Sequence, residues 1–270
     1  MPTYIVLGMH RSGTSAVAGM LDCLGVRMGP KNARPDWIGR HWSNPMGHFE
    51  NPDLVGLNGM ILDYDGTGVH ESARWDEVPE RARALESYIE RTLRASEGDV
   101  WGWKDPWSVL TVEEFLPWVH GPRFIFVLRD PDQVAISLLR RDRTGPEESR
   151  RITARFARAL AEIASKHPDV PRLELRFDDI MRDPGGTIDR LIAFTDLHSS
   201  PEQRRAAAGL VVDETTLRAM GRRLAWWELA TYPKWLAWLV ARDLRLGRRN
   251  LFAFWRNASQ ELVGAFRTAV

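Results

Sequence analysis

The stretch YIVLGMHRSGTSAVAGML, residues 4–21, predicts how this chain folds. A short apolar run leads into a turn with Gly8 and Gly13, and small and apolar residues at helical spacing follow. This order indicates a strand, a loop and a helix. Gly8, four residues, Gly13, Thr14 and Ser15 match the spacing of a phosphate-binding loop, except that Thr14 stands where nucleotide-triphosphate enzymes place lysine.

The glycines of this loop allow a sharp turn, so we expect the amides of Ser12 to Ser15 and the following helix N-terminus to face an anion. The lysine that would reach the β and γ phosphates is missing. Asp130, between Arg129 and Pro131, is an unusual magnesium ligand. These features weaken a kinase or ATPase interpretation, and a glycine turn without a ligand stays open.

Apolar runs bounded by turn signals alternate with helical patterns along the chain. The expected strands are Tyr4–Gly8, Asp99–Trp103, Arg123–Leu128 and Arg172–Phe177. The expected helices are Asp53–Leu62, Pro79–Ala95, Pro131–Arg141, Glu147–Lys166 and Gly186–Phe194. The alternation predicts an α/β fold, with a P-loop-like, mainly parallel sheet flanked by helices and a helical C-terminal extension.

The character of the sequence changes after about Asp213, where Trp, Leu and Arg residues are mixed. We therefore expect a core over residues 1–213 and a helical extension over residues 214–270 that packs on it. An aromatic and basic helix face fits such packing, and it also fits peripheral contact with a membrane surface. The apolar runs of the extension are too short to span a bilayer, and Arg242, Arg245 and Arg248 interrupt them.

Composition restricts the partners of the protein. The chain has 270 residues, 44% of them hydrophobic, and a formal net charge of +1, so it lacks the bulk basicity of a nucleic-acid coat. The single cysteine, Cys23, fits a reducing compartment, and the first residues form an expected strand instead of a signal peptide. We expect a cytoplasmic protein with no nucleic-acid partner. The histidines have no metal-ligand spacing, so we expect no metal site.

Three segments, HRSGTS (10–15), FIFVLRDPDQVAISL (124–138) and RFDDIMRDPGGTIDRLIAFTDL (176–197), resemble the sulfotransferase family that uses 3′-phosphoadenosine 5′-phosphosulfate. The resemblance implies that Arg11 contacts the phosphosulfate. It also implies that Ser12, Gly13, Thr14 and Ser15 surround the 5′-phosphate. No metal is implied, because a sulfuryl group carries less charge than a phosphoryl group.

The second and third segments imply a site for the rest of the nucleotide. Arg129 ends an expected strand and Ser137 follows eight residues later on a helix. The resemblance implies that both bind the 3′-phosphate, where arginine gives a charge-assisted bond. Phe177 falls where the family commonly has a tyrosine beside the adenine. Its ring keeps the capacity to stack, and core packing is the alternative.

Transfer of a sulfuryl group to a hydroxyl requires charge stabilisation and a general base. Lys104, in WGWKDP, follows an expected strand, and in many relatives a lysine at this place approaches the sulfuryl oxygens. A surface lysine is the alternative. The first candidate for the base is Glu50, the second is His48 and the third is Asp105. Glu50 equally fits a helix start, where an acid favours the dipole.

These observations predict a sulfotransferase that moves a sulfuryl group from 3′-phosphoadenosine 5′-phosphosulfate to a hydroxyl of a small molecule or carbohydrate. Two alternatives stay open. One is a P-loop kinase, which would need magnesium and ATP. The other is a non-catalytic module that binds a nucleotide or a membrane surface.

Overall fold

The computed structural model describes residues 2–30, 40, 44–63, 75–142, 145–213 and 215–224. Within them, four parallel strands form one sheet in the order β2-β1-β3-β4. The strands are β1 (Thr3–Leu7), β2 (Trp101–Lys104), β3 (Pro122–Leu128) and β4 (Arg172–Arg176). The predicted α/β fold with a parallel sheet is therefore confirmed.

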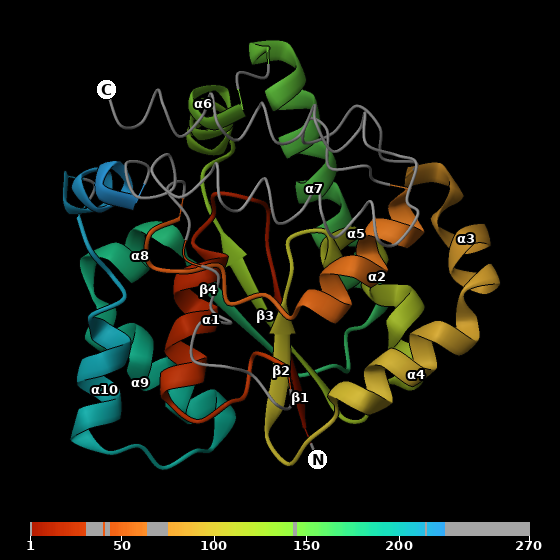
Figure 1. Cartoon of the computed structure of the whole chain (residues 1–270), viewed down its shortest axis with the longest axis horizontal. Coiled ribbons are helices and arrows are strands. Elements are labelled where there is room, and N and C mark those ends of the chain that lie inside the picture. The colour runs from red at the N-terminus through yellow and green to blue at the C-terminus, as the bar shows by residue number, and fades with distance from the viewer. Residues whose placement is uncertain are drawn as a thin grey trace, which may run out of the picture.

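The pairing of the strands aligns their carboxyl ends. Val6 lies opposite Lys104 of β2, and Leu7 lies opposite Phe126 of β3. Leu128 in turn lies opposite Arg176 of β4. The arrowheads of β2 and β3 in Figure 1 accordingly point toward the same end of the molecule. Parallel sheets bind ligands at this edge.

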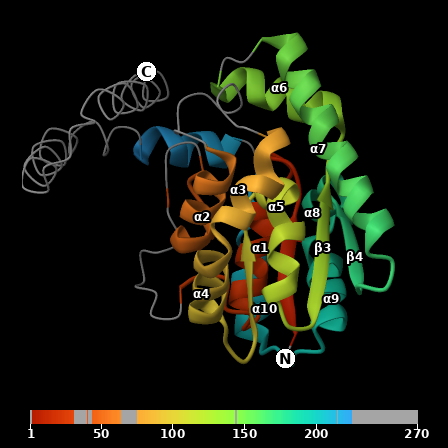
Figure 2. The ribbon, with the colours of Figure 1, turned by 90° about the vertical axis from the view of Figure 1, so that its right-hand side faces the viewer.

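Helices cover both faces of the sheet (Figures 1 and 2), because successive residues of a strand point to opposite faces. Ile5 and Leu7 of β1 belong to one buried cluster, whereas Tyr4 and Val6 belong to the other. The helices of the first cluster are α2 (Pro52–Leu62), α3 (Val78–Ala84), α4 (Glu86–Ser96), α5 (Ser108–Phe115), α6 (Pro131–Asp142) and α7 (Pro146–Lys166). Those of the second are α1 (Thr14–Cys23), α8 (Phe177–Arg182), α9 (Pro184–Thr195) and α10 (Pro201–Ala208).

The helix predicted over Pro79–Ala95 is wrong as a single element. It is two helices, α3 and α4, separated at Leu85, whose amide donates to the carbonyls of both Arg81 and Ala82. Because of the break, the two helices pack separately on the core. Ala82 of α3 and Ile89 of α4 belong to the same buried cluster. Helical periodicity alone did not reveal it.

Three helices were not predicted: α5, α8 and α10. Helix α8 begins at Phe177, so the strand expected to include this residue ends one residue earlier, at Arg176. Helix α10 has a capping box, in which Ser200 and Gln203 bond to each other's backbone amides, and Pro201 at its first position. That signal was present in the sequence.

The predicted C-terminal extension is described only over residues 215–224, which are helical. Residues 225–270, with the Trp- and Arg-rich stretch for which packing or membrane contact was predicted, lie outside the described residues. In the described part of the chain, no helix combines the length and apolarity needed to cross a membrane.

Substitution of Phe156 by Ala tests the packing of α7 on the sheet. The Phe156 side chain is fully buried in the first cluster. Its removal should lower the free energy of unfolding by about 3–5 kcal/mol, because burial is lost and a cavity remains. Urea unfolding measures the change. The exposed Arg158→Ala on the same helix is the control, and equal effects of the two variants would contradict this packing.

Candidate functional site

A cavity of about 640 Å³ lies at the carboxyl-end edge of the sheet. It is lined by the loop after β1, residues 44–50, the end of β2, α6, α8 and residues 210–217. The predicted site residues that line it are Arg11, Gly13, Thr14, Ser15, His48, Glu50, Lys104, Arg129, Ser137 and Phe177. Segments far apart in the sequence thus converge on one cavity.

The loop after β1 is shaped by its glycines. Gly13 has φ 89° and caps α1 without a side-chain hydrogen bond. A Cβ at Gly8 would lie 2.6 Å from the Val127 carbonyl oxygen, so only glycine lets the loop approach β3 this closely. The first-turn amides of α1, among them those of Thr14 and Ser15, have no acceptor within the helix. These amides are of the kind that bind anions at helix N-termini, and the anion site predicted from the sequence stays a prediction.

Ser12 is the predicted loop residue that does not line this cavity. Its amide donates to the Met9 carbonyl oxygen at 3.2 Å, and its side chain is buried away from the 640 Å³ cavity. The Ser12 amide therefore closes the turn of the loop in this structure, and its predicted contact with an anion stays a prediction.

Arg11 lies at the centre of a set of contacts between the loop and α6. Its Nε donates to Ser137 Oγ at 3.0 Å, and Arg129 Nη1 donates to its carbonyl oxygen at 2.7 Å. Arg11 has φ 66°, a left-handed conformation that costs free energy in a residue with a side chain. The hydroxyl of Ser137, predicted beside Arg129, is held by Arg11.

The guanidinium of Arg129 lies over the ring of Phe177, with 3.9 Å between its central carbon and the ring centre. This is cation–π geometry. A Cβ at Gly13 would come within 2.9 Å of the same ring, so Phe177 packs between the loop and Arg129. Phe177 is half-buried and lines the cavity, so it is not a residue of the hydrophobic core.

Lys104 is not a surface residue. Its side chain is 1% exposed, and its Nζ donates to Glu50 Oε1 at 2.5 Å and to Ser15 Oγ at 3.1 Å. Asn44 Nδ2 also donates to Ser15 Oγ, at 3.0 Å. Glu50 is 25% exposed, and His48 Nδ1 lies 4.0 Å from its Oε1. The ion pair between Lys104 and Glu50 therefore lies at the cavity wall with one partner open to the cavity.

Asp105 lies behind this ion pair and does not line the cavity. It is buried, with Oδ2 accepting from Asn58 Nδ2 at 2.7 Å and Oδ1 accepting from the Trp107 amide at 3.1 Å. Burial and, secondly, the nearby Glu50 carboxylate raise the pKa of Asp105 to about 7, although both hydrogen bonds and Lys104 act in the opposite direction. Its carboxyl is therefore not exposed to the cavity, where a substrate would bind.

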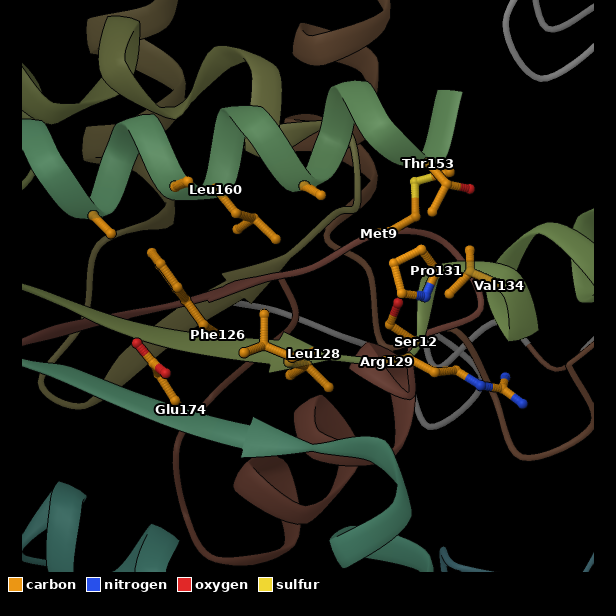
Figure 3. A pocket seen from close by; sticks show the side chains of 14 residues that line it. Met9, Ser12, Phe126, Leu128, Arg129, Pro131, Val134, Thr153, Leu160 and Glu174 are labelled. Atoms are coloured by element: carbon orange, nitrogen blue, oxygen red, sulfur yellow. The ribbon is translucent and has the colours of Figure 1, made fainter. Parts of the chain in front are cut away.

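A second cavity, of about 250 Å³, lies between β3 and α7 (Figure 3). Its walls are mainly apolar, with Phe126, Leu128 and Leu160 among the labelled side chains, and the Arg129 side chain points away from it. Ligand sites combine a concave shape with convergent polar groups. The 640 Å³ cavity has that combination, so it is the candidate functional site.

Several cavity residues were not predicted. Asn44 reaches Ser15, and Gln133 Oε1 accepts from Arg129 Nε at 3.3 Å. Gln133 lies on the first turn of α6, four residues after Arg129, and this short separation was the available signal. Residues that follow α10 in the sequence add an apolar part to the cavity wall, namely Leu210, Val211, Val212 and Leu217. No sequence pattern linked these residues to the phosphate-binding loop.

Comparison with known proteins supplies the family. A model described as "Sulfotransferase family" matches residues 2–201. A search of curated proteins finds no match. The chain is similar to the sulfotransferase domain of the Synechococcus PCC 7002 olefin synthase (16% identity, 83% of this chain and 87% of that one, TM-score 0.48). It is also similar to sulfotransferase STF1 from Mycobacterium tuberculosis H37Rv (16% identity, 82% and 76%, TM-score 0.46).

The burial of Asp105 predicts how stability depends on pH. Its pKa is higher in the folded chain than in the unfolded one, so between about pH 4 and 7 only the folded state keeps the proton. Its contribution to the free energy of unfolding is fully present below pH 4 and is lost as the pH rises through about 7. Relative to Asp105→Asn, the wild type should lose up to about 1.4 kcal/mol per pH unit over this range. Urea unfolding from pH 4.5 to 8 measures this slope, and parallel curves for the two proteins would refute it.

Proposed function

Because the chain belongs to the sulfotransferase family, we propose that it transfers a sulfuryl group from 3′-phosphoadenosine 5′-phosphosulfate to a hydroxyl of a small-molecule or carbohydrate acceptor. Family membership makes the chain a transferase. The donor and the type of acceptor rest on one observation. Arg11, Lys104 and Arg129 line the same cavity as the N-terminus of α1, which has no side-chain cap.

This cavity fits a nucleotide with several anionic groups. Its volume is within the ordinary range of ligand sites, and its three cations and the helix amides favour phosphate and sulfate. The first turn of α1, including Thr14 and Ser15, would hold the 5′-phosphate. Arg129 would bind the 3′-phosphate and Phe177 would stack on the adenine.

Arg11 and Ser137 face the same region of the cavity. Since Ser137 Oγ accepts from Arg11 Nε, the pair would act together on the bridge between the phosphate and the sulfuryl group. Arg11 would stabilise the negative charge that develops on the leaving phosphate. The contact of Ser137 with the 3′-phosphate, predicted from the sequence, remains the alternative to this role.

Lys104 and Glu50 would carry the transfer itself. When bound, the donor supplies the sulfuryl group with a phosphate as leaving group. The Lys104 ammonium would stabilise charge on the sulfuryl oxygens, and Glu50 would accept the proton of the acceptor hydroxyl. His48, 4.0 Å from Glu50, is the second candidate for the base.

The remaining predictions keep that status. They are the division of the chain at residue 213, the cytoplasmic location, and peripheral membrane contact through residues beyond 224. The choice between a small-molecule and a carbohydrate acceptor also remains a prediction. The kinase and the non-catalytic module are the outcomes that the following experiments separate from the proposal.

Binding of 3′,5′-adenosine bisphosphate tests the donor site. Calorimetric titration without metal should show micromolar affinity. Arg129→Ala should weaken it about 10- to 100-fold, because a charge-assisted contact is lost. Arg150→Ala, an exposed arginine on α7 outside the cavity, is the matched control. Tighter binding of ATP that depends on magnesium would favour the kinase, and the absence of binding to either nucleotide would exclude the proposal.

Glu50→Gln tests the base. Conversion of the donor to the bisphosphate is measured with a panel of alcohols, phenols and sugars, and the fastest acceptor is then used. Loss of the carboxylate should lower kcat about 10²- to 10⁴-fold, with the affinity for the bisphosphate changed by less than about threefold. Glu162→Gln, exposed on α7, is the control. If His48→Gln has the large effect and Glu50→Gln the small one, the roles are exchanged. If the wild type binds the nucleotide but turns over no acceptor, the non-catalytic module is favoured.

A further inference from the structure

A buried hydrogen-bond network lies behind the ion pair of Lys104 and Glu50. At its centre, Asn58 Nδ2 donates to Asp105 Oδ2 at 2.7 Å. Both residues are almost fully buried, with exposed fractions of 0% for Asn58 and 2% for Asp105. Neither lines the cavity, so neither is placed to touch a substrate.

The network is well connected on the Asn58 side. Asn58 Oδ1 accepts from Thr111 Oγ1 at 2.5 Å, and its Nδ2 also reaches Ser108 Oγ at 3.1 Å. Ser108 Oγ in turn accepts from Trp103 Nε1 at 3.1 Å. The network therefore joins α2 to the last residues of β2 and to α5. Buried polar networks whose members are satisfied fix a unique arrangement of the elements that they join.

This arrangement determines where Glu50 lies. Glu50 immediately precedes Asn51, whose side chain caps α2, so the position of α2 sets the position of the Glu50 backbone. Lys104 is the residue before Asp105 and ends β2. The Asn58–Asp105 hydrogen bond thus joins α2, which follows Glu50 directly, to the end of β2, where Lys104 lies.

The charges on Asp105, Glu50 and Lys104 are also linked. The Glu50 carboxylate disfavours ionisation of Asp105 and the Lys104 ammonium favours it, whereas Asn58 and the Trp107 amide donate hydrogen bonds to the carboxylate. Since the pKa of Asp105 is about 7, its carboxyl is mostly neutral at pH 6 and mostly ionised at pH 8. Ionisation would place a second negative charge beside the single Lys104 ammonium.

We propose that Asp105 is a positioning residue, which holds Glu50 against Lys104 through its buried hydrogen bond to Asn58. This inference rests on the proposed function, in which Glu50 and Lys104 carry the transfer. Asp105 was the third candidate for the general base in the sequence analysis, and the role proposed here is a different one. A displacement of about 1 Å at a reacting group is enough to lower a rate about 10²-fold. Loss of the hydrogen bond between Asn58 and Asp105 should therefore reduce turnover.

The test compares Asp105→Asn with the swap Asn58→Asp/Asp105→Asn. Asp105 uses both carboxyl oxygens as acceptors, one from Asn58 Nδ2 and one from the Trp107 amide. The single variant leaves one oxygen at this position, so one of these two donors faces an NH2 group and the hydrogen bond to Asn58 is lost or weakened. The swap restores a donor–acceptor pair between the same positions, but with the charge moved to α2. Thr195→Val, which removes a buried hydroxyl bond inside α9, is the control for general destabilisation. Turnover of the donor, bisphosphate affinity and thermal unfolding are measured for each protein at pH 6 and pH 8.

At pH 6 both Asp105 and its Asn replacement are neutral, so their difference reports the hydrogen bond. We expect kcat of Asp105→Asn to fall at least about 10-fold at pH 6, with bisphosphate affinity changed by less than about threefold. The swap should recover most of that loss. Asp105→Asn should also lose the part of the pH dependence of kcat that ionisation of Asp105 contributes, whereas the swap carries its carboxyl at position 58. If Asp105→Asn does not fold, the milder Thr111→Val, which loosens Asn58, should still lower kcat more than Thr195→Val does.

Different results overturn different claims. If the wild type neither binds the bisphosphate nor turns over the donor, the proposed function fails and the inference fails with it. If the wild type is active and Asp105→Asn matches it in kcat and pH profile, only the positioning role is excluded. A swap that leaves kcat as low as in the single variant, or a Thr195→Val variant with an equal loss, also excludes it.

Discussion

The parallel pairing of β1 with its two neighbours is the constraint on which the rest of the site depends. Because Val6 lies opposite Lys104 and Leu7 lies opposite Phe126, the loop after β1 and the ends of β2 and β3 meet at one edge. β4 extends this edge, so that Phe177 follows directly after its last residue. A shift of one residue in any pair would turn buried strand residues toward the wrong face. The register that buries the core therefore also assembles the cavity.

Burial of Lys104 is one electrostatic cost of this arrangement. An ammonium group loses much of its hydration when its side chain is 1% exposed, and a nearby carboxylate offsets this only with good geometry. Glu50 supplies that geometry at 2.5 Å, and Ser15 Oγ accepts a second hydrogen bond. Because Ser15 belongs to the first turn of α1, the buried cation also links β2 to the start of α1. The hydrogen bonds to Glu50 and Ser15 thus stabilise the buried ammonium group and also fix its position at the cavity wall.

Much of this could be predicted from the sequence, because short-range patterns determine it. The strand before the glycine-containing loop and the strand that ends next to Arg129 follow from apolar runs and turn residues. The break at Leu85 depends on packing of two helices on a common core, which periodicity does not encode. The hydrogen bond between Arg11 and Ser137 joins residues 126 positions apart, so no local signal could show it. Burial of Lys104 likewise depends on α1 and residues 44–50 closing over the end of β2.

The ion pair also bears on how proton transfer and charge stabilisation would be coupled in the proposed reaction. Lys104 and Glu50 together carry no net charge while Glu50 is ionised. A proton that moves from the acceptor hydroxyl to Glu50 neutralises the carboxylate and leaves the Lys104 ammonium unbalanced. In the proposed reaction the pair would then become positive as negative charge builds up on the leaving phosphate, so Lys104 would act more strongly on the transition state than on the bound substrate. Such coupling requires the two groups to stay in contact throughout, which is why the packing of α2 against the end of β2 matters to the chemistry.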